Sequence, residues 1–289
     1  MPKPLATISS DIQEQMYRPT NIYYMNTIEC NQKCTKCSHW KYKDKVDRLP
    51  IEKFVIGIKS IPTATELCIV GGEPLLFKSE IYEILRGISD TNIRTVIITN
   101  GVSMDRHFIN TVAKYNIHIV VSIDTMDKEF WKFVRGTNSK EKVLKNFEYA
   151  TTILTPAQLS IQSVLSKETQ HHLADVEEYA KSKNIHHSIQ DYISEGFEGS
   201  WTATENKQVI IPDHEQQCFA ADRNLSIVQN GDVHTCFQQN WIEGCQKPLG
   251  NLNTQTMTEI LSSDYSAFVS EKMRICNLPC KILKCNIKD

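Results

Sequence analysis

The sequence has no apolar run approaching the roughly 20 residues of a membrane-spanning helix. Its first twenty residues, MPKPLATISSDIQEQMYRPT, contain no apolar stretch of signal-peptide length. It also has no excess of charge of one sign, since 32 Lys and Arg stand against 34 Asp and Glu. We therefore expect a soluble, cytoplasmic protein with no nucleic-acid partner and no membrane partner.

Cysteine, in contrast, is plentiful, with ten residues in the chain. Without an export signal a disulfide framework is not expected, because it needs an oxidising compartment. The cysteines form two groups, and none lies between residues 69 and 217. Clustered cysteines in a cytosolic chain favour metal binding, so we expect two metal sites, one near each end of the chain.

Apolar runs alternate with amphipathic runs over the first two thirds of the chain. The periods predict strands at 21–29, 65–74, 94–101, 117–124, 158–166 and 186–194. They predict helices at 51–61, 79–89, 104–116, 140–154 and 171–184. This order indicates an α/β fold with a parallel sheet and right-handed crossovers. Six βα units are too few for the closed eight-stranded barrel, so we expect an open, partial (β/α)6 barrel.

The pattern changes near residue 195. We assign residues 1–194 to the barrel, 195–217 to a linker or lid, and 218–289 to a small C-terminal domain. Within the latter, residues 225–237 predict a hairpin around Asn230-Gly231, a common turn sequence. Residues 255–273 predict one helix or two short ones.

Three short motifs follow predicted strands: CNQKCTKC (30–37), GGEP (71–74) and TNG (99–101). Because active sites of such folds lie at the carboxyl ends of the strands, these motifs should meet at one rim. The first motif supplies only three thiols, Cys30, Cys34 and Cys37. In a cubane of four irons, three thiolates leave one iron open for a substrate or cofactor.

The CxxxCxxC loop after a first strand, with GGEP after the second, resembles the signature of radical S-adenosylmethionine (SAM) enzymes. The resemblance implies a [4Fe–4S] cluster whose open iron is chelated by the amino and carboxylate groups of SAM. It implies reductive cleavage of SAM to a 5′-deoxyadenosyl radical, which abstracts a hydrogen atom from the substrate. It also implies an electron donor such as flavodoxin or ferredoxin.

The same resemblance assigns the GGEP residues to SAM. Gly71 and Gly72 are expected to let the backbone approach the ligand closely. Glu73 is expected to provide an acceptor near the SAM ammonium, and Pro74 to stiffen the turn.

Later strand ends resemble further SAM contacts. Asn100 and Ser122 match positions that contact the carboxylate and ribose, and Asp124 is a second ribose candidate. Lys36 departs from the family pattern, in which the residue before the third cysteine is often aromatic or apolar. We therefore expect adenine packing to differ, with Trp40 as a candidate.

The C-terminal cysteines resemble the auxiliary-cluster domains called SPASM and, when shortened, twitch. Cys218, Gly231 and Cys236 have the spacing of their opening motif. About 70 residues follow Cys218, which favours the one-cluster twitch form. The terminal spacing CxxxCxxxxC departs from the expected CxxC. The implied ligands of a second [4Fe–4S] cluster are Cys218, Cys236, Cys276 and Cys280, with Cys285 as an alternative.

Cys245 is left without a place in these motifs. A spare thiol can return a hydrogen atom to a substrate radical, as in radical epimerases, or it can be structural. The expected reaction is therefore dehydrogenation or epimerisation. The lack of a separate N-terminal leader-binding domain favours a small-molecule substrate, an aminocyclitol or sugar of a natural-product pathway. A ribosomal peptide is the alternative.

Zinc is the competing interpretation for both cysteine groups. Cys68 could complete a site with the first three cysteines, although its place within a predicted strand favours a core thiol. Zinc at both ends would indicate a non-catalytic protein that binds a partner.

Overall fold

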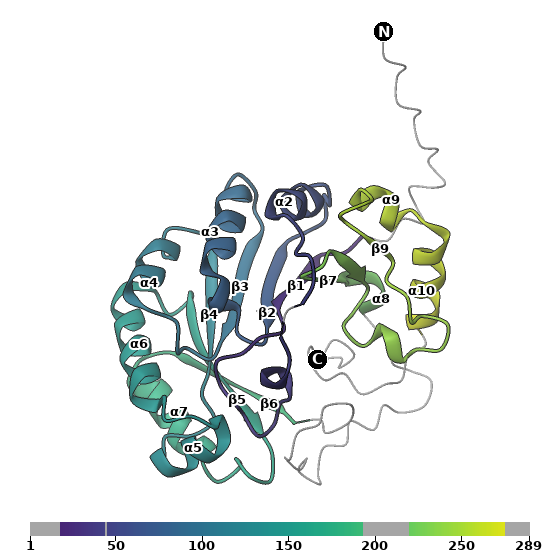
Figure 1. Cartoon of the computed structure of the whole chain (residues 1–289). Coiled ribbons are helices and arrows are strands. Elements are labelled where there is room, and N and C mark those ends of the chain that lie inside the picture. Colours follow the sequence, from purple (N-terminus) through teal and green to yellow (C-terminus); the bar gives the residue numbers. More distant parts are fainter. Residues whose placement is uncertain (1–17, 44, 193–219, 275–289) are drawn as a thin grey trace.

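The structure is a computed structural model that describes residues 18–43, 45–192 and 220–274 (Figure 1). The predicted linker or lid and Cys218, Cys276, Cys280 and Cys285 lie outside the described residues. Within them, no helix combines the length and apolar character needed to span a membrane.

The strands are β1 (Asn21–Thr27), β2 (Glu66–Gly71), β3 (Arg94–Thr99), β4 (Ile117–Ser122), β5 (Leu159–Leu165), β6 (His186–Asp191), β7 (Asn224–Val228), β8 (Asp232–His234) and β9 (Gly250–Asn251). The α-helices are α2 (Ile51–Lys59), α3 (Lys78–Gly87), α4 (Arg106–Val112), α5 (Lys128–Arg135), α6 (Lys140–Ile153), α7 (Leu173–Ser182), α8 (Ala220–Arg223), α9 (Met257–Leu261) and α10 (Asp264–Arg274). Short 3-10 turns are η1 (His39–Lys41), η2 (Pro74–Phe77) and η4 (Gln239–Trp241).

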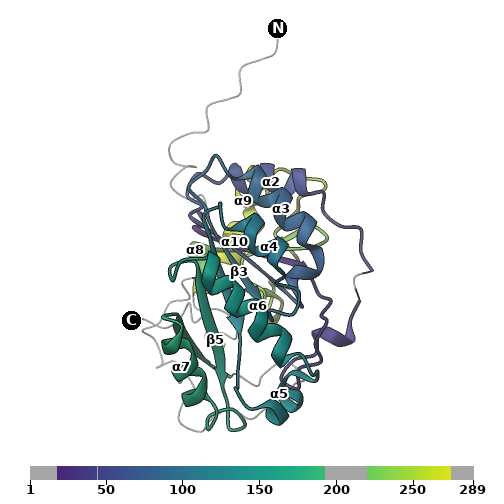
Figure 2. The ribbon, with the colours of Figure 1, turned by 90° about the vertical axis from the view of Figure 1, so that its left-hand side faces the viewer.

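The described strands form one sheet in the order β6-β5-β4-β3-β2-β1-β7-β8-β9. Strands β1 to β6 are parallel and lie in chain order, with helices along the outer face of the curved sheet (Figures 1 and 2). The predicted six-stranded partial barrel is confirmed. Strands β6 and β9 are the two edges of the described sheet and do not pair with each other, so the barrel is open.

Strand β7 was predicted, but its partner was not. It pairs in parallel with β1, and Tyr23 lies opposite Ser226. The predicted hairpin is confirmed: β7 turns at Gly231, whose φ of +89° suits glycine, and pairs antiparallel with β8. The segment from residue 220 to 251 thus continues the sheet of the barrel beside the first strand.

Helix α5 was missed in the sequence, although both of its ends carry clear signals. The Asp127 side chain accepts a hydrogen bond from the Phe130 N–H and so caps the first turn (2.6 Å). Gly136 ends the helix in the left-handed conformation, with φ of +62°. Helix α4 was predicted, but it is shorter than the expected 104–116.

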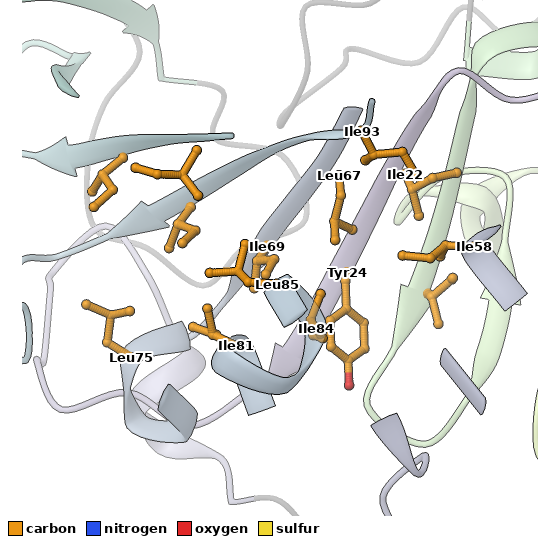
Figure 3. Packing of buried hydrophobic residues seen from close by; sticks show 14 of the residues in the cluster. Ile22, Tyr24, Ile58, Leu67, Ile69, Leu75, Ile81, Ile84, Leu85 and Ile93 are labelled. Carbon is orange, nitrogen blue, oxygen red and sulfur yellow. The ribbon is translucent and has the colours of Figure 1, made fainter. Parts of the chain in front are cut away.

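The main core lies between the sheet and its outer helices. Leu67 and Ile69 of β2 pack near Ile84 and Leu85 of α3 (Figure 3). Side chains on alternate strand positions point to this layer and leave the others for the inner face. The close packing makes the sheet a firm support for the loops at its carboxyl edge.

Removal of buried methyl groups should therefore cost far more than the same change on the surface. Ile69 is 0% exposed, whereas Ile56 on α2 is 62% exposed. We expect Ile69→Ala to lower the free energy of unfolding by about 2–5 kcal/mol and Ile56→Ala to change it by no more than about 0.5 kcal/mol. Urea denaturation of the two variants tests this, and equal effects would contradict the described packing.

Candidate active site

The cysteine loop is joined to the GGEP segment by backbone hydrogen bonds. Gly72 N–H donates to Thr27 C=O and Glu73 N–H to Glu29 C=O, both at 2.8 Å. A Cβ atom would lie 2.2 Å from Thr27 O at Gly71 and 2.1 Å from Glu29 O at Gly72. In this structure the two glycines allow the close approach of residues 27–29, which lead into the cysteine loop. Their expected closeness to a ligand stays a prediction.

The Glu73 side chain is fully buried and joins the ends of β2 and β3. Its Oε1 accepts from Thr99 Oγ1 (2.6 Å) and Leu75 N–H (3.0 Å), and its Oε2 accepts from Asn100 N–H (2.8 Å). Burial raises the pKa of this carboxyl, and the hydrogen bonds lower it only in part. Both carboxylate oxygens thus accept hydrogen bonds from the protein in this structure. The expected contact of Glu73 with the SAM ammonium stays a prediction.

Asn100 reaches the cysteine loop from the end of β3. Its Nδ2 lies 2.7 Å from Asn31 Oδ1 and 3.8 Å from Cys30 Sγ. Pro74 is buried at the start of η2, and Ser122 ends β4 in a half-buried position. These residues share the carboxyl rim of the sheet, as predicted from the strand order, but their roles toward SAM stay predictions.

The three thiols lie close enough to affect one another. Cys34 is buried, whereas Cys30 and Cys37 are half-buried. Burial, with smaller contributions from negative charge on Glu73, Cys34 and Cys37, raises the pKa of the Cys30 thiol to about 12, although a hydrogen bond from Gln32 N–H opposes this rise. An iron–sulfur cluster requires thiolates, so this loop needs nearby positive charge.

Helix α5 holds the cysteine loop from the other side. Lys33 N–H donates to Arg135 C=O and Thr35 N–H to Val134 C=O, both at 3.1 Å. A Cβ atom at Gly136 would lie 2.3 Å from Lys33 O, so the left-handed glycine permits this contact. The last turn of α5 and the GGEP segment thus fix the loop at two points.

Asp124, at the end of the β4 segment, is fully buried between two cations. Its Oδ2 lies 2.7 Å from Arg135 Nη2 and 3.0 Å from Lys36 Nζ, and its Oδ1 accepts from Val164 N–H (2.8 Å). Burial would raise the pKa of Asp124, but Arg135 and Lys36 more than offset it and hold that pKa below its usual range. The expected ribose contact of Asp124 stays a prediction that would require one of these bonds to be exchanged.

The charges around the loop fit an anionic cluster. The buried guanidinium of Arg135 and the half-buried ammonium of Lys36 face one carboxylate, and burial lowers the pKa of Lys36. Arg135 Nε and Nη2 donate no well-directed hydrogen bond within the described part of the chain. Burial would lower the pKa of this guanidinium, but Asp124 and, to a smaller extent, the neighbouring Cys34 thiol raise it above its usual value. Cys30, Cys34 and Cys37 would hold a cluster here, and Lys36 and Arg135 would offset its charge.

The zinc alternative finds little support in the described geometry. Cys68 is buried in β2, where burial and the neighbouring Glu66 raise the pKa of its thiol. Across the described ranges, no three His, Cys, Asp or Glu side chains converge on a single-ion site. A cubane needs no such convergence, because each thiolate binds a different iron.

Only Cys236 of the predicted auxiliary ligands lies within the described residues, after β8. The next residue, Phe237, packs edge-on against Tyr23 of β1 (ring centroids 6.5 Å apart). Cys245 is 0% exposed and belongs to the main core. The expected role of Cys245 as a hydrogen donor stays a prediction.

Among curated proteins, GTP 3′,8-cyclase 1 of Mycobacterium tuberculosis is 26% identical over 185 residues. That match covers 60% of this chain and 51% of the relative. The chain thus spans about half the length of the curated relatives it matches.

Among solved structures, Streptococcus suis SuiB bound to S-adenosylmethionine has a TM-score of 0.73 at 15% identity. The match covers 94% of this chain and 75% of SuiB. SuiB bound to its precursor peptide SuiA matches with a TM-score of 0.66. The protein anSMEcpe with bound AdoMet and the Cp18Cys peptide matches with a TM-score of 0.64 at 18% identity, over 87% of this chain and 82% of that one. These likenesses show the fold.

Two family models match the sequence. The model of an iron–sulfur cluster-binding domain, SPASM, matches residues 218–286. The model of the radical SAM superfamily matches residues 27–180, more than half of the 289-residue chain. The chain therefore belongs to the radical SAM superfamily, in its SPASM subgroup, whose cofactors are SAM, a [4Fe–4S] cluster and auxiliary iron–sulfur clusters.

Proposed function

We propose that this chain cleaves SAM at its three-cysteine loop and dehydrogenates a peptide substrate. The observation that carries the SAM-cleaving part is the loop itself. Its three thiols lie at the carboxyl rim of the parallel sheet, beside the buried Arg135 and the half-buried Lys36, which share the carboxylate of Asp124.

When bound, SAM and the iron–sulfur clusters would supply the radical chemistry, namely one-electron cleavage of SAM, removal of a substrate hydrogen atom, and an acceptor for the electron that the substrate radical releases together with a proton to a base. The protein's own part is to position the reactants. Cys30, Cys34 and Cys37 would hold the cluster. Backbone hydrogen bonds from Gly72 and Glu73 position the residues that lead into their loop. The buried guanidinium of Arg135 offsets negative charge in a site of low polarity, where such an interaction is strong.

Two solved structures support a peptide substrate. SuiB was solved with its precursor peptide, and anSMEcpe with the Cp18Cys peptide. The SuiB likeness extends over 94% of this chain and so includes the described C-terminal segment. These complexes favour a peptide over the small molecule expected from the sequence.

A small molecule is the second candidate, and the curated relatives favour it. The relative from Mycobacterium tuberculosis is named for a reaction of GTP, a small molecule. The aminocyclitol or sugar dehydrogenase predicted from the sequence belongs to this class of candidates.

Dehydrogenation is preferred to epimerisation because of Cys245. In the epimerase hypothesis this thiol donates a hydrogen atom to the substrate radical, but its side chain is 0% exposed in the structure. Dehydrogenation needs only an electron acceptor and a base, and so makes no demand on this cysteine.

Cleavage of SAM should depend on the loop cysteines and not on cysteine in general. After anaerobic reconstitution and reduction with dithionite, we expect Cys34→Ala to lose at least about 100-fold in 5′-deoxyadenosine formation, since it removes a cluster ligand. Cys68→Ala makes the same chemical change in the core and should retain most of the activity. Chromatography of the products measures this, and retained activity in Cys34→Ala would refute the assignment of the loop.

The buried carboxylate should hold the loop even without a cluster. Asp124→Asn leaves two buried cations without their anion, so we expect the free energy of unfolding of the cluster-free protein to fall by about 3–5 kcal/mol. Asp105→Asn is the matched control, because Asp105 is 56% exposed and asparagine also caps a helix. Thermal unfolding of both variants tests this. A stable Asp124→Asn variant would show that the ion triad is dispensable.

The substrate class can be tested before the substrate itself is identified. We expect the peptide fraction of a cell digest, and not its small-molecule fraction, to raise 5′-deoxyadenosine formation above the substrate-free rate. The product should lack two hydrogen atoms by mass spectrometry and take up no solvent deuterium at the reacting carbon. Cys245→Ala should behave like the wild type. Stimulation by small molecules alone would favour the second candidate, and deuterium incorporation that Cys245→Ala abolishes would favour epimerisation.

A further inference from the structure

Positive charge is concentrated around the cysteine loop. Residues 30–48 contain six Lys or Arg and two Asp, a net charge of +4, in a chain whose net charge is −2. The rest of the chain is therefore acidic overall. Lys36 faces inward toward Asp124 and Arg48 pairs with Glu80, but Lys33, Lys41, Lys43 and Lys45 are exposed.

Two of these lysines meet at one aromatic ring. The Nζ atoms of Lys33 and Lys41 lie 6.0 Å and 5.8 Å from the ring centroid of Trp40. Trp40 Nε1 in turn donates to Cys37 C=O at 2.9 Å. The indole thus connects exposed, positively charged side chains directly to the backbone of a proposed cluster ligand.

Apolar side chains lie among the lysines. Tyr42 is 51% exposed and Val46 is 43% exposed. Three acidic residues, Glu29, Asp44 and Asp47, stand against the four exposed lysines in the sequence, and Glu29 pairs with Lys43 (3.0 Å), so the positive charge is reduced but not cancelled. An exposed aromatic and aliphatic centre with charged residues around it is typical of a protein-binding surface.

We propose that this surface docks an acidic electron-donor protein. We call it the lysine–tryptophan patch and define it by Lys33, Trp40, Lys41, Tyr42, Lys43, Lys45 and Val46. The inference rests on the proposed function, because reductive cleavage of SAM consumes one electron from outside in each event. That electron leaves the reduced centre of the donor and enters the cluster, and no bond is made or broken in the transfer.

Charge complementarity selects the partner. A donor with an acidic face would be attracted to the patch, and such attraction raises association rates by about 10-fold to 1000-fold at low ionic strength. An acidic substrate would be attracted by the same charge. The link from Trp40 to Cys37 favours the donor, because it connects the patch to the cluster ligand.

The experiment compares two reductants on the reconstituted full-length protein. The variant is Lys41→Glu/Lys45→Glu, two exposed residues outside the cysteine loop, and the matched control is Lys114→Glu/Lys145→Glu, which makes the same charge change at exposed residues before β4 and on α6. The rate of 5′-deoxyadenosine formation is measured against the concentration of reduced flavodoxin at low and high ionic strength. Dithionite is the small reductant, and bound iron is measured in every protein.

With flavodoxin at low ionic strength, we expect the patch variant to lose on the order of tenfold in kcat/KM. The loss should shrink at high ionic strength, where salt screens the charges. The control variant should match the wild type, and with dithionite all three proteins should be equally active.

Three results would overturn the proposal. The first is an equal flavodoxin response of the patch and control variants. The second is an equal loss with dithionite, which would place the effect at the cluster or at SAM. The third is a raised KM for a substrate under dithionite, which would assign the patch to the substrate. If the wild type forms no 5′-deoxyadenosine with dithionite, the proposed function itself is wrong and this inference fails with it.

Discussion

One buried carboxylate, that of Asp124, holds together the segments that form the candidate site. It follows β4, accepts a hydrogen bond from the β5 backbone at Val164, and pairs with Arg135 of α5 and Lys36 of the cysteine loop. All three charged side chains are largely removed from water, where an unpaired charge is costly. The loop, the helix and the sheet edge are therefore held in one arrangement.

The same three charged side chains, Asp124, Arg135 and Lys36, also determine the electrostatic environment of the expected cofactor. A loop with three partly buried thiols resists ionisation, since burial raises the pKa of Cys30 to about 12. The guanidinium of Arg135, which interacts with both Asp124 and the Cys34 thiol, would offset the negative charge of a cluster. Glu73 and the glycines before it fix the opposite side of the loop through backbone contacts. Protein contacts on two sides therefore position Cys30, Cys34 and Cys37.

The sequence predicted the strands, the open barrel and the position of the motifs, because these depend on local periodicity and on the rule that parallel strands end at one edge. The sequence did not predict the contacts between residues that are far apart along the chain. Lys36 and Asp124 are 88 residues apart, and nothing local joins them. The departure of Lys36 from the family pattern was visible in the sequence, but its pairing with Asp124 was not. The pairing of β7 with β1 is equally long-range. Helix α5, in contrast, was predictable from its capping residues, Asp127 and Gly136.

The most direct test of the account is the amount of iron and acid-labile sulfide per chain after anaerobic reconstitution. The wild type is compared with a variant in which Cys30, Cys34 and Cys37 are all replaced by alanine. With one auxiliary cluster, the account predicts roughly eight irons in the wild type and about four in the variant. An unchanged iron content in the variant, or zinc in place of iron in the wild type, would contradict it.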